Sequence, residues 1–362
     1  MKALIVKDVG VLEMQDIPEP EPSPDEIKVK IAYAGICGTD PVIVEGKTFG
    51  KGLRPEGAIG WPPKAAPIRD DLRIMGQQMR DGMRILGHEA SGTIVQIGKN
   101  VGGNLKVGQR VAMNFRSTCG ACYYCNNQKA HFCERRNPIS GAMAEYSVYR
   151  ESIVFPLPDD VTLDIVAFLE PVSIAAHTVI DIGQVKMGDS VIITGAGPIG
   201  LLIMELAIKS GASKVLVSEP TAERRKLAKQ LGADVVVDPL KEDLLEISNK
   251  LTDGRGYDVC FEVTGRTSIA KQLILLADVG GTIVWVATYP PNLDLGVPIF
   301  YMHTRELTIR DVMPSPYSYP VALKMLPKLD LKPLITIFPF KDALKAFDVH
   351  KAGKDEKIML QM

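Results

Sequence analysis

The stretch Val191–Glu219 reads VIITGAGPIGLLIMELAIKSGASKVLVSE and decides the fold of its part of the chain. Its first apolar residues are typical of a strand that is buried on both faces of a parallel sheet. The G-x-G-x-x-G turn Gly195–Gly200 follows, then a helical pattern, then a second apolar run that ends on Glu219. Strand, glycine turn, helix, strand and acid in this order form the dinucleotide-binding fingerprint. The stretch therefore predicts a Rossmann unit that binds a dinucleotide.

Each glycine of the turn has its own physical purpose. Gly195 permits the tight turn, Gly197 lets the backbone approach a pyrophosphate, and Gly200 lets the helix pack closely on the strand. Free N–H groups at the start of the helix favour the phosphates. Glu219 can accept a hydrogen bond from a ribose 2′-hydroxyl and would repel a 2′-phosphate, which favours NAD. The predicted cofactor-binding residues of the turn are Gly195, Gly197, Pro198, Ile199 and Gly200.

Length and composition limit the class of protein. At 362 residues the chain is long enough for two domains. Its formal net charge of −1 gives no support for nucleic-acid binding. No apolar run reaches the eighteen or so residues that a membrane span needs. The N-terminus MKALIVKDVG lacks a signal peptide, so we expect a cytoplasmic protein.

The residue pattern changes along the chain. Between about residues 188 and 300 strands alternate with helices, which predicts an α/β fold with a doubly wound parallel sheet. Earlier residues alternate apolar and polar side chains, which favours antiparallel strands. We expect a β-rich catalytic domain over 1–158, a Rossmann domain over 159–305, and a return to the catalytic domain over 306–362.

Four of the six cysteines lie close together in the sequence. Cys119, Cys122, Cys125 and Cys133 have the spacing C-x2-C-x2-C-x7-C. Four thiolates from one short loop can surround Zn²⁺ and leave no open position, which is a structural site. An iron–sulfur cluster or disulfides would use the same residues, but clustering in a reducing compartment favours a metal.

A second possible metal group is scattered along the chain. Cys37, His88, Glu89 and Glu170 would suit catalytic zinc with one position left for water or substrate. Such a zinc lowers the pKa of a bound hydroxyl, and a nicotinamide on the glycine turn would then take a hydride. Spacing alone does not establish this group.

Several motifs together carry a family resemblance. GICGTD, GHE with a hairpin ending in GQRVA, the cysteine cluster, LEPVSIAAH and TGAGPIG occur in this order. The chain resembles the zinc-dependent medium-chain dehydrogenases, most closely their polyol branch of sorbitol, 2,3-butanediol and threonine dehydrogenases. The resemblance covers nearly the whole chain. It implies a GroES-like catalytic domain and a Rossmann domain with zinc and NAD in the cleft between them, in a homodimer or homotetramer.

The resemblance also assigns roles to single residues. By similarity, Cys37 and His88 are ligands of the catalytic zinc, and Glu89 either ligates it or stands behind it. Glu170 occupies the position where the polyol branch has a glutamate, bound directly or through water. Thr39 matches the hydroxyl that takes the substrate proton.

Further residues are expected to contact the cofactor. Arg224 matches a basic residue that often flanks the adenosine, and Arg305 resembles an arginine near the nicotinamide, although a surface ion pair would explain Arg305 as well. Thr264 and Ala287 follow apolar runs, where the carboxyl ends of strands meet ligands.

The sequence departs from its relatives at two points. Val42 stands where many relatives have a histidine that passes the proton onward, so the relay beyond Thr39 is open. Cys37 and His88 are also further apart than is usual in this branch, because of a Gly/Pro-rich segment, 46–81. We interpret this segment as an insertion that shapes the substrate pocket or a subunit contact, against an inert surface loop.

These observations predict an NAD-dependent zinc alcohol dehydrogenase (EC 1.1.1.-) that acts on a secondary alcohol, namely a polyol, diol, cyclitol or hydroxy amino acid, and produces a ketone. One alternative is a zinc-free NADPH-dependent enone or quinone reductase of the same fold, which would need neither metal group. Another is a non-enzymatic nucleotide-sensing or zinc-bearing module. The individual substrate is not encoded in any short motif.

Overall fold

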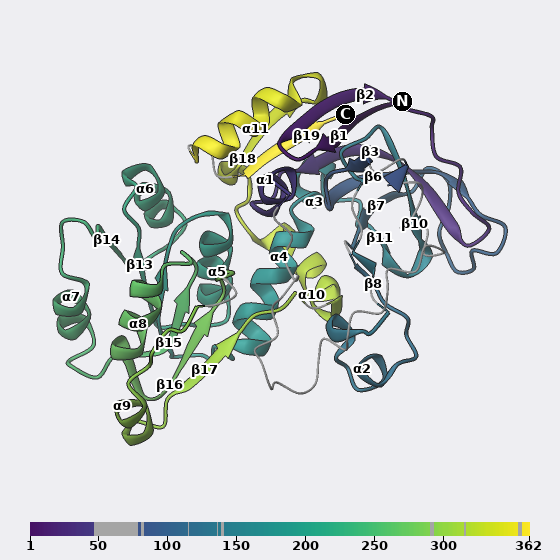
Figure 1. Ribbon diagram of the computed structural model, residues 1–362. Coiled ribbons are helices and arrows are strands. Elements are labelled where there is room, and N and C mark those ends of the chain that lie inside the picture. Colours follow the sequence, from purple (N-terminus) through teal and green to yellow (C-terminus); the bar gives the residue numbers. More distant parts are fainter. Residues whose placement is uncertain are drawn as a thin grey trace. The chain divides into compact units, whose positions relative to one another are not determined.

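The computed structural model describes residues 1–46, 79–80, 83–114, 116–135, 137–138, 141–289, 293–314, 316–353 and 357–362. The chain divides into two compact units (Figure 1). Unit 1 contains Met1–Glu170 and Ser315–Met362, and unit 2 contains Pro171–Pro314. The sequence placed its boundaries at residues 158 and 305, whereas the structure divides the chain after Glu170 and after Pro314.

Unit 1 is built mainly from antiparallel strands. Its largest sheet has the order β11-β7-β6-β3-β19-β18, with β10 paired to β3, and a second sheet has the order β2-β1-β5-β4. The strands are β1 (Lys2–Asp8), β2 (Val11–Asp16), β3 (Glu26–Gly35), β4 (Met79–Arg80), β5 (Met83–Ile85), β6 (Glu89–Ile97), β7 (Arg110–Met113), β8 (Arg116–Ser117), β9 (Asn137–Pro138), β10 (Tyr146–Arg150), β11 (Val154–Pro156), β18 (Ile335–Pro339) and β19 (Lys357–Gln361).

Short helices and turns connect these strands. The α-helices of unit 1 are α1 (Thr39–Val44), α2 (Tyr123–Asn126), α3 (Leu163–Val166), α10 (Tyr319–Met325) and α11 (Ala343–Ala352). The 3₁₀ turns are η1 (Ala130–Phe132), η2 (Glu151–Ile153), η4 (Pro316–Ser318), η5 (Leu326–Lys328), η6 (Lys332–Leu334) and η7 (Phe340–Asp342). Ile27, Val29 and Ile31 of β3 are buried in one cluster with Phe347 of α11. Their alternation along β3 explains why the sequence shows a period of two.

Strand pairing in the largest sheet brings three distant parts of the chain together. Gly35 at the end of β3 pairs with Glu89 at the start of β6, and also with Met359 of β19. Both pairings are antiparallel, so the loop after β3 begins beside the starts of β6 and β19. In Figure 1 the last strand, β19, is yellow, and its partner β3 is purple. This arrangement positions the candidate metal group described below.

Unit 2 contains the predicted parallel sheet. Its strand order is β14-β13-β12-β15-β16-β17, and every pair is parallel. The strands are β12 (Ser190–Thr194), β13 (Lys214–Ser218), β14 (Val235–Val237), β15 (Tyr257–Glu262), β16 (Ala277–Trp285) and β17 (Thr308–Asp311). The helices are α5 (Pro198–Lys209), α6 (Ala222–Gln230), α7 (Leu244–Leu251), α8 (Thr267–Leu276) and α9 (Ile299–Thr304), preceded by η3 (His177–Ile182). The boundary helix α4 (Leu169–Ala176) begins in unit 1 and continues into unit 2.

The order of these strands creates a switch point beside β12. From β12 the chain moves outward to β13 and β14, then returns to β15 on the other side of β12. Because parallel crossovers are right-handed, the helices of the two halves cover opposite faces of the sheet, and Figure 1 shows helices on both sides of it. Ligands of such sheets bind at the carboxyl ends of the strands next to the switch point.

One element differs from the prediction. The sequence assigned TIRDVM to the segment that returns to the first domain, but β17 extends the parallel sheet of unit 2 next to β16. The six-residue helix α9 and a proline-containing connection link these two strands. A helix of six residues is too short to show a helical period in the sequence, which explains the error.

The segment 46–81 that we interpreted as an insertion lies almost entirely outside the described residues. Among the helices that the structure does describe, none is both long enough and apolar enough to cross a membrane.

Candidate functional site

The structure brings three of the four scattered ligand candidates together in unit 1. Ligand atoms of Cys37, His88 and Glu89 all lie within 4.8 Å of one another. Cys37 lies two residues after β3, His88 directly precedes β6 and Glu89 begins it, so the antiparallel pairing of β3 with β6 creates the group. Glu89 is buried, whereas Cys37 and His88 are partly accessible. A sulfur, an imidazole and a carboxylate with one accessible side match a catalytic zinc site.

Asp40 lies next to the group of Cys37, His88 and Glu89. Its side chain is fully buried, and Oδ2 accepts a hydrogen bond from the backbone N–H of Cys37 at 2.8 Å. Its other oxygen, Oδ1, lies 3.8 Å from Nδ1 of His88 and has no hydrogen-bond partner among the residues that the structure describes. A carboxylate on this side of the imidazole leaves Nε2 to serve as the metal ligand. Asp40 therefore fixes the backbone at Cys37 and places a carboxylate beside the imidazole of His88.

Lys357 is the buried counter-ion of Glu89. Its Nζ is ion-paired with Oε2 of Glu89 and donates a hydrogen bond to the carbonyl oxygen of Ile36 at 3.0 Å. The side chains of Lys357 and Glu89 are only 6% and 1% exposed. Lys357 thus joins the segment that carries Cys37 to the segment that carries His88. Gly35 lies against this pair, because a Cβ there would collide with Oε2 of Glu89.

Glu170 lies close enough to act on the same group electrostatically. Burial, and next the negative charge of Glu89, raise the pKa of Glu170 to about 7, while His88 and Lys357 oppose the shift. Burial would lower the pKa of His88, but Cys37, Asp40 and Glu170 together hold it well above its usual value. The surroundings therefore favour positive charge at this point. A divalent cation would meet this requirement, so the donor set fits zinc.

The neighbouring residues of the motif fall on α1. Thr39 begins this helix, two residues after Cys37, and is partly accessible. Val42 lies on the same helix and is partly buried. An apolar side chain at this position offers no atom that can carry a proton.

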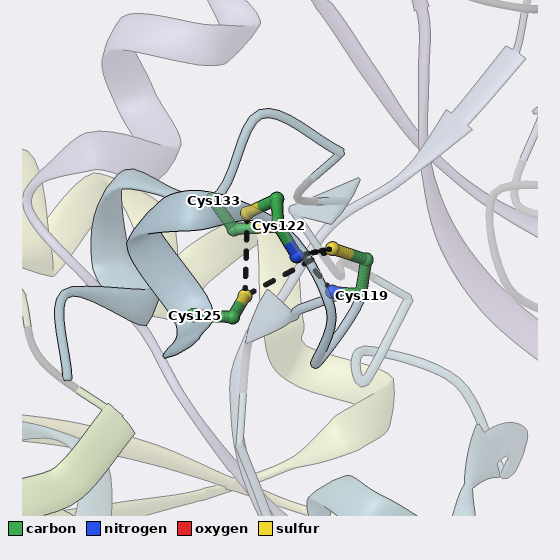
Figure 2. Close-up of side chains that lie close together, drawn as sticks. All are labelled: Cys119, Cys122, Cys125 and Cys133. Atoms are coloured by element: carbon green, nitrogen blue, oxygen red, sulfur yellow. Dashed lines mark hydrogen bonds between the residues drawn. The ribbon is translucent and has the colours of Figure 1, made fainter. Parts of the chain in front are cut away.

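The four clustered cysteines converge as the spacing predicts, around a helical turn in unit 1 (Figure 2). The sulfur atoms of Cys122 and Cys125 are 3.6 Å apart, and those of Cys119 and Cys125 are 3.9 Å apart. Tetrahedral zinc with Zn–S bonds of about 2.3 Å places its sulfurs about 3.8 Å apart. Sγ of Cys133 also accepts a hydrogen bond from the backbone N–H of Cys119. None of the four is in a disulfide, and the geometry fits a closed structural zinc site.

We expect Cys122→Ser to lose one zinc ion per chain and to lower the stability of unit 1. Three remaining thiolates bind zinc less tightly. Loss of this cross-link should lower the free energy of unfolding by on the order of 2–5 kcal/mol, the range for removal of a native disulfide. Elemental analysis and thermal denaturation would measure both effects. Cys260→Ser is the matched control, because Cys260 is buried in the core of unit 2, outside both metal groups, and should leave the zinc content unchanged.

The glycine turn in unit 2 has the geometry that its sequence predicts. Gly195 follows β12 with φ of +97°, a conformation that favours glycine, and its N–H donates to the carbonyl oxygen of Ser218 at 2.8 Å. A Cβ on Gly200 would collide with the carbonyl oxygen of Gly195. Helix α5 begins at Pro198 and Ile199 directly after Gly197, so its free N–H groups face the end of the turn.

Glu219 lies beside this turn. Its Oε2 accepts a hydrogen bond from the N–H of Ala196, and Oε1 accepts one from the N–H of Thr221, both at 2.8 Å. Each carboxylate oxygen keeps a lone pair that could accept a hydrogen bond from a hydroxyl group. Arg224 is also near the turn, because a Cβ on Gly197 would lie 3.9 Å from its guanidinium.

Thr264 and Ala287 also lie at the carboxyl edge of the sheet. They belong to the loops after β15 and β16, and the Cβ position of Gly195 is 3.1 Å from Cγ2 of Thr264. The structure therefore gathers the expected cofactor residues of the glycine turn, of β13 and of these two loops at one edge.

Arg305 does not join this group. Its carbonyl oxygen accepts a hydrogen bond from Gly280 near the start of β16, and its guanidinium lies 4.7 Å from the ring of Tyr301. It precedes β17, so it stands at the amino edge of the sheet, opposite the glycine turn. Within unit 2, Arg305 therefore lies apart from the glycine turn, because β17 belongs to the parallel sheet and fixes the direction of the residues before it.

Two contributors to the metal group were not identified from the sequence. Asp40 is part of the GICGTD motif, which could have drawn attention to it. Lys357 stands in KIMLQM, where nothing in the residue pattern marks it as functional. Only the pairing of β19 with β3 shows that this lysine reaches Glu89.

Comparisons with known proteins agree with this geometry. Residues 23–159 match the model of the alcohol dehydrogenase GroES-like domain, and residues 198–327 match that of zinc-binding dehydrogenases. The chain is 30% identical to D-arabitol-phosphate dehydrogenase of Enterococcus avium, covering 96% of this chain and 92% of the relative. It is 33% identical to sorbitol dehydrogenase of Gallus gallus, covering 99% and 96%.

A solved structure extends the comparison to three dimensions. The crystal structure of a putative zinc-binding dehydrogenase from Sinorhizobium meliloti, bound to NADP, is 26% identical with a TM-score of 0.85, and the match covers 100% of this chain and 99% of that one. The chain belongs to the zinc-dependent medium-chain dehydrogenases, in the polyol branch, and is an oxidoreductase of the alcohol dehydrogenase type.

Proposed function

We propose that this protein is an NAD-dependent dehydrogenase that oxidises a secondary alcohol to a ketone. The substrate class is a polyol, diol, cyclitol or hydroxy amino acid. The observation that carries the proposal is the convergence of Cys37, His88 and Glu89 within 4.8 Å, in surroundings that favour a cation. A chain that also holds a dinucleotide turn has both parts that alcohol oxidation requires.

The residues would divide the work as follows. Cys37 and His88, with the carboxylates of Glu89 and Glu170, would hold a zinc ion. When bound, zinc supplies Lewis-acid polarisation of the substrate oxygen and lowers the pKa of its hydroxyl. Thr39 would accept the hydroxyl proton while it releases its own to water or a ribose hydroxyl, because Val42 offers no atom that could carry a proton along the helix.

On the cofactor side, the glycine turn and the start of α5 would hold the pyrophosphate. Thr264 and Ala287 would flank the nicotinamide, and Arg224 would flank the adenosine. Alignment of the substrate C–H bond with the nicotinamide then contributes much of the rate.

The test is a panel of polyols, vicinal diols, sugar-alcohol phosphates and hydroxy amino acids, assayed by the absorbance of reduced nicotinamide. Zinc content is measured on the same preparation, with two ions expected per chain, one for each ligand group. A protein that reduces an enone with NADPH and works fully without zinc would contradict the proposal. So would full zinc loading with no affinity for either nicotinamide cofactor.

NAD is the cofactor that Glu219 supports, although the Sinorhizobium relative was crystallised with NADP. A carboxylate at the end of β13 would accept the ribose hydroxyls and repel a 2′-phosphate. We expect Glu219→Ala to weaken NAD binding roughly 10–100-fold, as for a lost hydrogen bond to a charged group, while NADP binding weakens less or improves. Titrations of both cofactors measure the change.

Glu223→Ala is the control for this variant, because Glu223 is an exposed acid on the neighbouring helix α6. It changes the net charge equally, so it should leave the preference for NAD over NADP unaltered. An equal loss of NAD and NADP affinity in Glu219→Ala would mean that Glu219 only supports the turn through Ala196 and Thr221.

Two broader features belong to the same proposal. We place the protein in the cytoplasm, because five of its six free cysteines belong to the two metal groups, whose thiols must be reduced to bind metal. A homodimer or homotetramer is supported by α9, where Ile299 and Phe300 are 74% and 81% exposed next to the edge strand β17. Light scattering after gel filtration would give the assembly state.

A further inference from the structure

Unit 2 contains a buried carboxylate that the metal chemistry does not use. Glu262 ends β15 beside Thr194 of β12 and is fully buried. Its Oε1 accepts hydrogen bonds from the N–H of Thr264 at 2.7 Å and from the hydroxyl of Thr264. Its Oε2 accepts hydrogen bonds from the N–H of Gly265 at 3.1 Å and from the hydroxyl of Tyr289. Four donors fill the acceptor capacity of a carboxylate.

Tyr289 is the one of these donors that comes from another loop. It lies in the loop after β16, whereas Thr264 and Gly265 lie in the loop after β15. Its ring meets that of Trp285 edge-on, with centroids 6.3 Å apart. Burial, together with the hydrogen bond and charge of Glu262, raises the pKa of Tyr289, so the phenol keeps its proton and remains a donor. The Tyr289 hydroxyl therefore ties the two loops together.

The tied loops stand at the ligand edge of the sheet. A Cβ on Gly265 would lie 3.5 Å from Cβ of Ala287 and 3.8 Å from the carbonyl oxygen of Thr288, so the loops are in contact. Thr264 in turn contacts the glycine turn at Gly195. No ion pair to Glu262 is found within the described part of the chain, so these hydrogen bonds alone compensate its burial.

The strand order indicates which half of a dinucleotide meets these loops. Glu219 follows β13, on one side of β12, and it marks the adenosine half. The pyrophosphate belongs at the turn after β12. The other half must then extend over β15 and β16, where the two tied loops emerge.

We propose that Tyr289 is a positioning residue, which through Glu262 holds the loops after β15 and β16 in the shape that receives the nicotinamide half of the cofactor. This inference rests on the proposed function and adds a determinant that lies outside the glycine turn. Loss of the tie would leave a fully buried carboxylate one donor short, which the loop can relieve only by moving.

The experiment compares NADH with ADP, which lacks the nicotinamide half. In Tyr289→Phe we expect the dissociation constant of NADH to rise about tenfold, the effect of one hydrogen bond to a charged group, and that of ADP to change less than twofold. The KM for NAD should rise with it. Tyr301→Phe is the matched control, since this tyrosine is in the same unit at the opposite edge of the sheet, and it should change neither constant.

Glu262→Gln provides a second variant. The amide NH₂ of the glutamine would face the N–H and hydroxyl donors that now bind the carboxylate. NADH binding should therefore fall while ADP binding persists. The double variant Tyr289→Phe with Glu262→Gln should lose no more NADH affinity than Glu262→Gln alone, because both changes break one network. Additive losses would contradict the inference.

Other outcomes separate this inference from the proposed function. If Tyr289→Phe weakens NADH and ADP equally, the tie is merely structural, and if it weakens neither, the tie has no role in binding; each result overturns the inference and leaves the proposed function intact. If the unaltered protein binds ADP but not NADH, the proposed function fails and the inference fails with it.

Discussion

Lys357→Met should destabilise unit 1 by roughly 3–5 kcal/mol, the cost of breaking a buried ion pair by removing one partner. Methionine replaces the apolar stem of the lysine but leaves Glu89, which is 1% exposed, without its cation. The hydrogen bond to the carbonyl oxygen of Ile36 is lost as well. Denaturant unfolding of Lys357→Met and of the unaltered protein measures the loss of unfolding free energy. This loss should be larger in metal-free protein, because bound zinc supplies part of the missing positive charge.

Two comparisons make the Lys357 result specific. Lys2→Met removes the partner of Asp16 from an ion pair whose side chains are 54% and 75% exposed, and it should cost under about 1 kcal/mol. The double variant Lys357→Met with Glu89→Gln removes both charges, so it should regain a large part of the lost stability. If the double variant is as unstable as the single one, the charge of Glu89 is not what Lys357 compensates.

Cys37→Ser should lower the dehydrogenase activity by about a thousandfold or more, with little effect on the free energy of unfolding. A hydroxyl replaces the softest ligand of the group, and loss of Lewis-acid stabilisation worth several kcal/mol corresponds to at least three powers of ten in rate. Cys37 is partly accessible at the end of β3, so the substitution leaves the core unchanged. Steady-state kinetics and elemental analysis measure activity and the loss of one zinc ion.

Cys122→Ser should show the opposite pattern, in which stability falls more than activity for each molecule that remains folded. Substitution of Co²⁺ for zinc gives a readout apart from turnover, because the Cys37→Ser variant should lose the absorption of only one of two cobalt sites. Equal loss of both metals in Cys37→Ser would mean that the two groups are not independent. Retention of both metals with unchanged activity would rule out Cys37 as a ligand.

The sequence was most informative where the information is local. The strand, glycine turn and acid of Val191–Glu219 lie within one continuous stretch, and their order alone predicted the parallel sheet that contains β12 and β13. The four-cysteine loop is local in the same sense, since its ligands are at most fourteen residues apart. Over such spans the chain has few ways to fold, so spacing restricts geometry.

Longer-range relations were predicted less well. The strand β17 was assigned to the wrong domain. The crossover that joins it to β16 contains only the short helix α9, which gives no clear helical pattern in the sequence. The expected role of Arg305 rested on family resemblance, because a single arginine carries no spacing that would place it. The ligand set of Cys37 and His88 rested on family resemblance, since residues so far apart carry no distance information in their spacing.

The sequence by itself determined the two-part architecture, the dinucleotide turn and the closed cysteine site, because each is encoded in residues that are close along the chain. Tertiary structure alone decided that β19 lies next to β3, and therefore that Lys357 compensates Glu89 behind the candidate zinc ligands. It also decided that Tyr289 reaches Glu262 across two loops. The physical reason is the same in both cases: strand pairing brings together groups whose charges and hydrogen bonds matter only at contact distance, and no local pattern records which strands will pair.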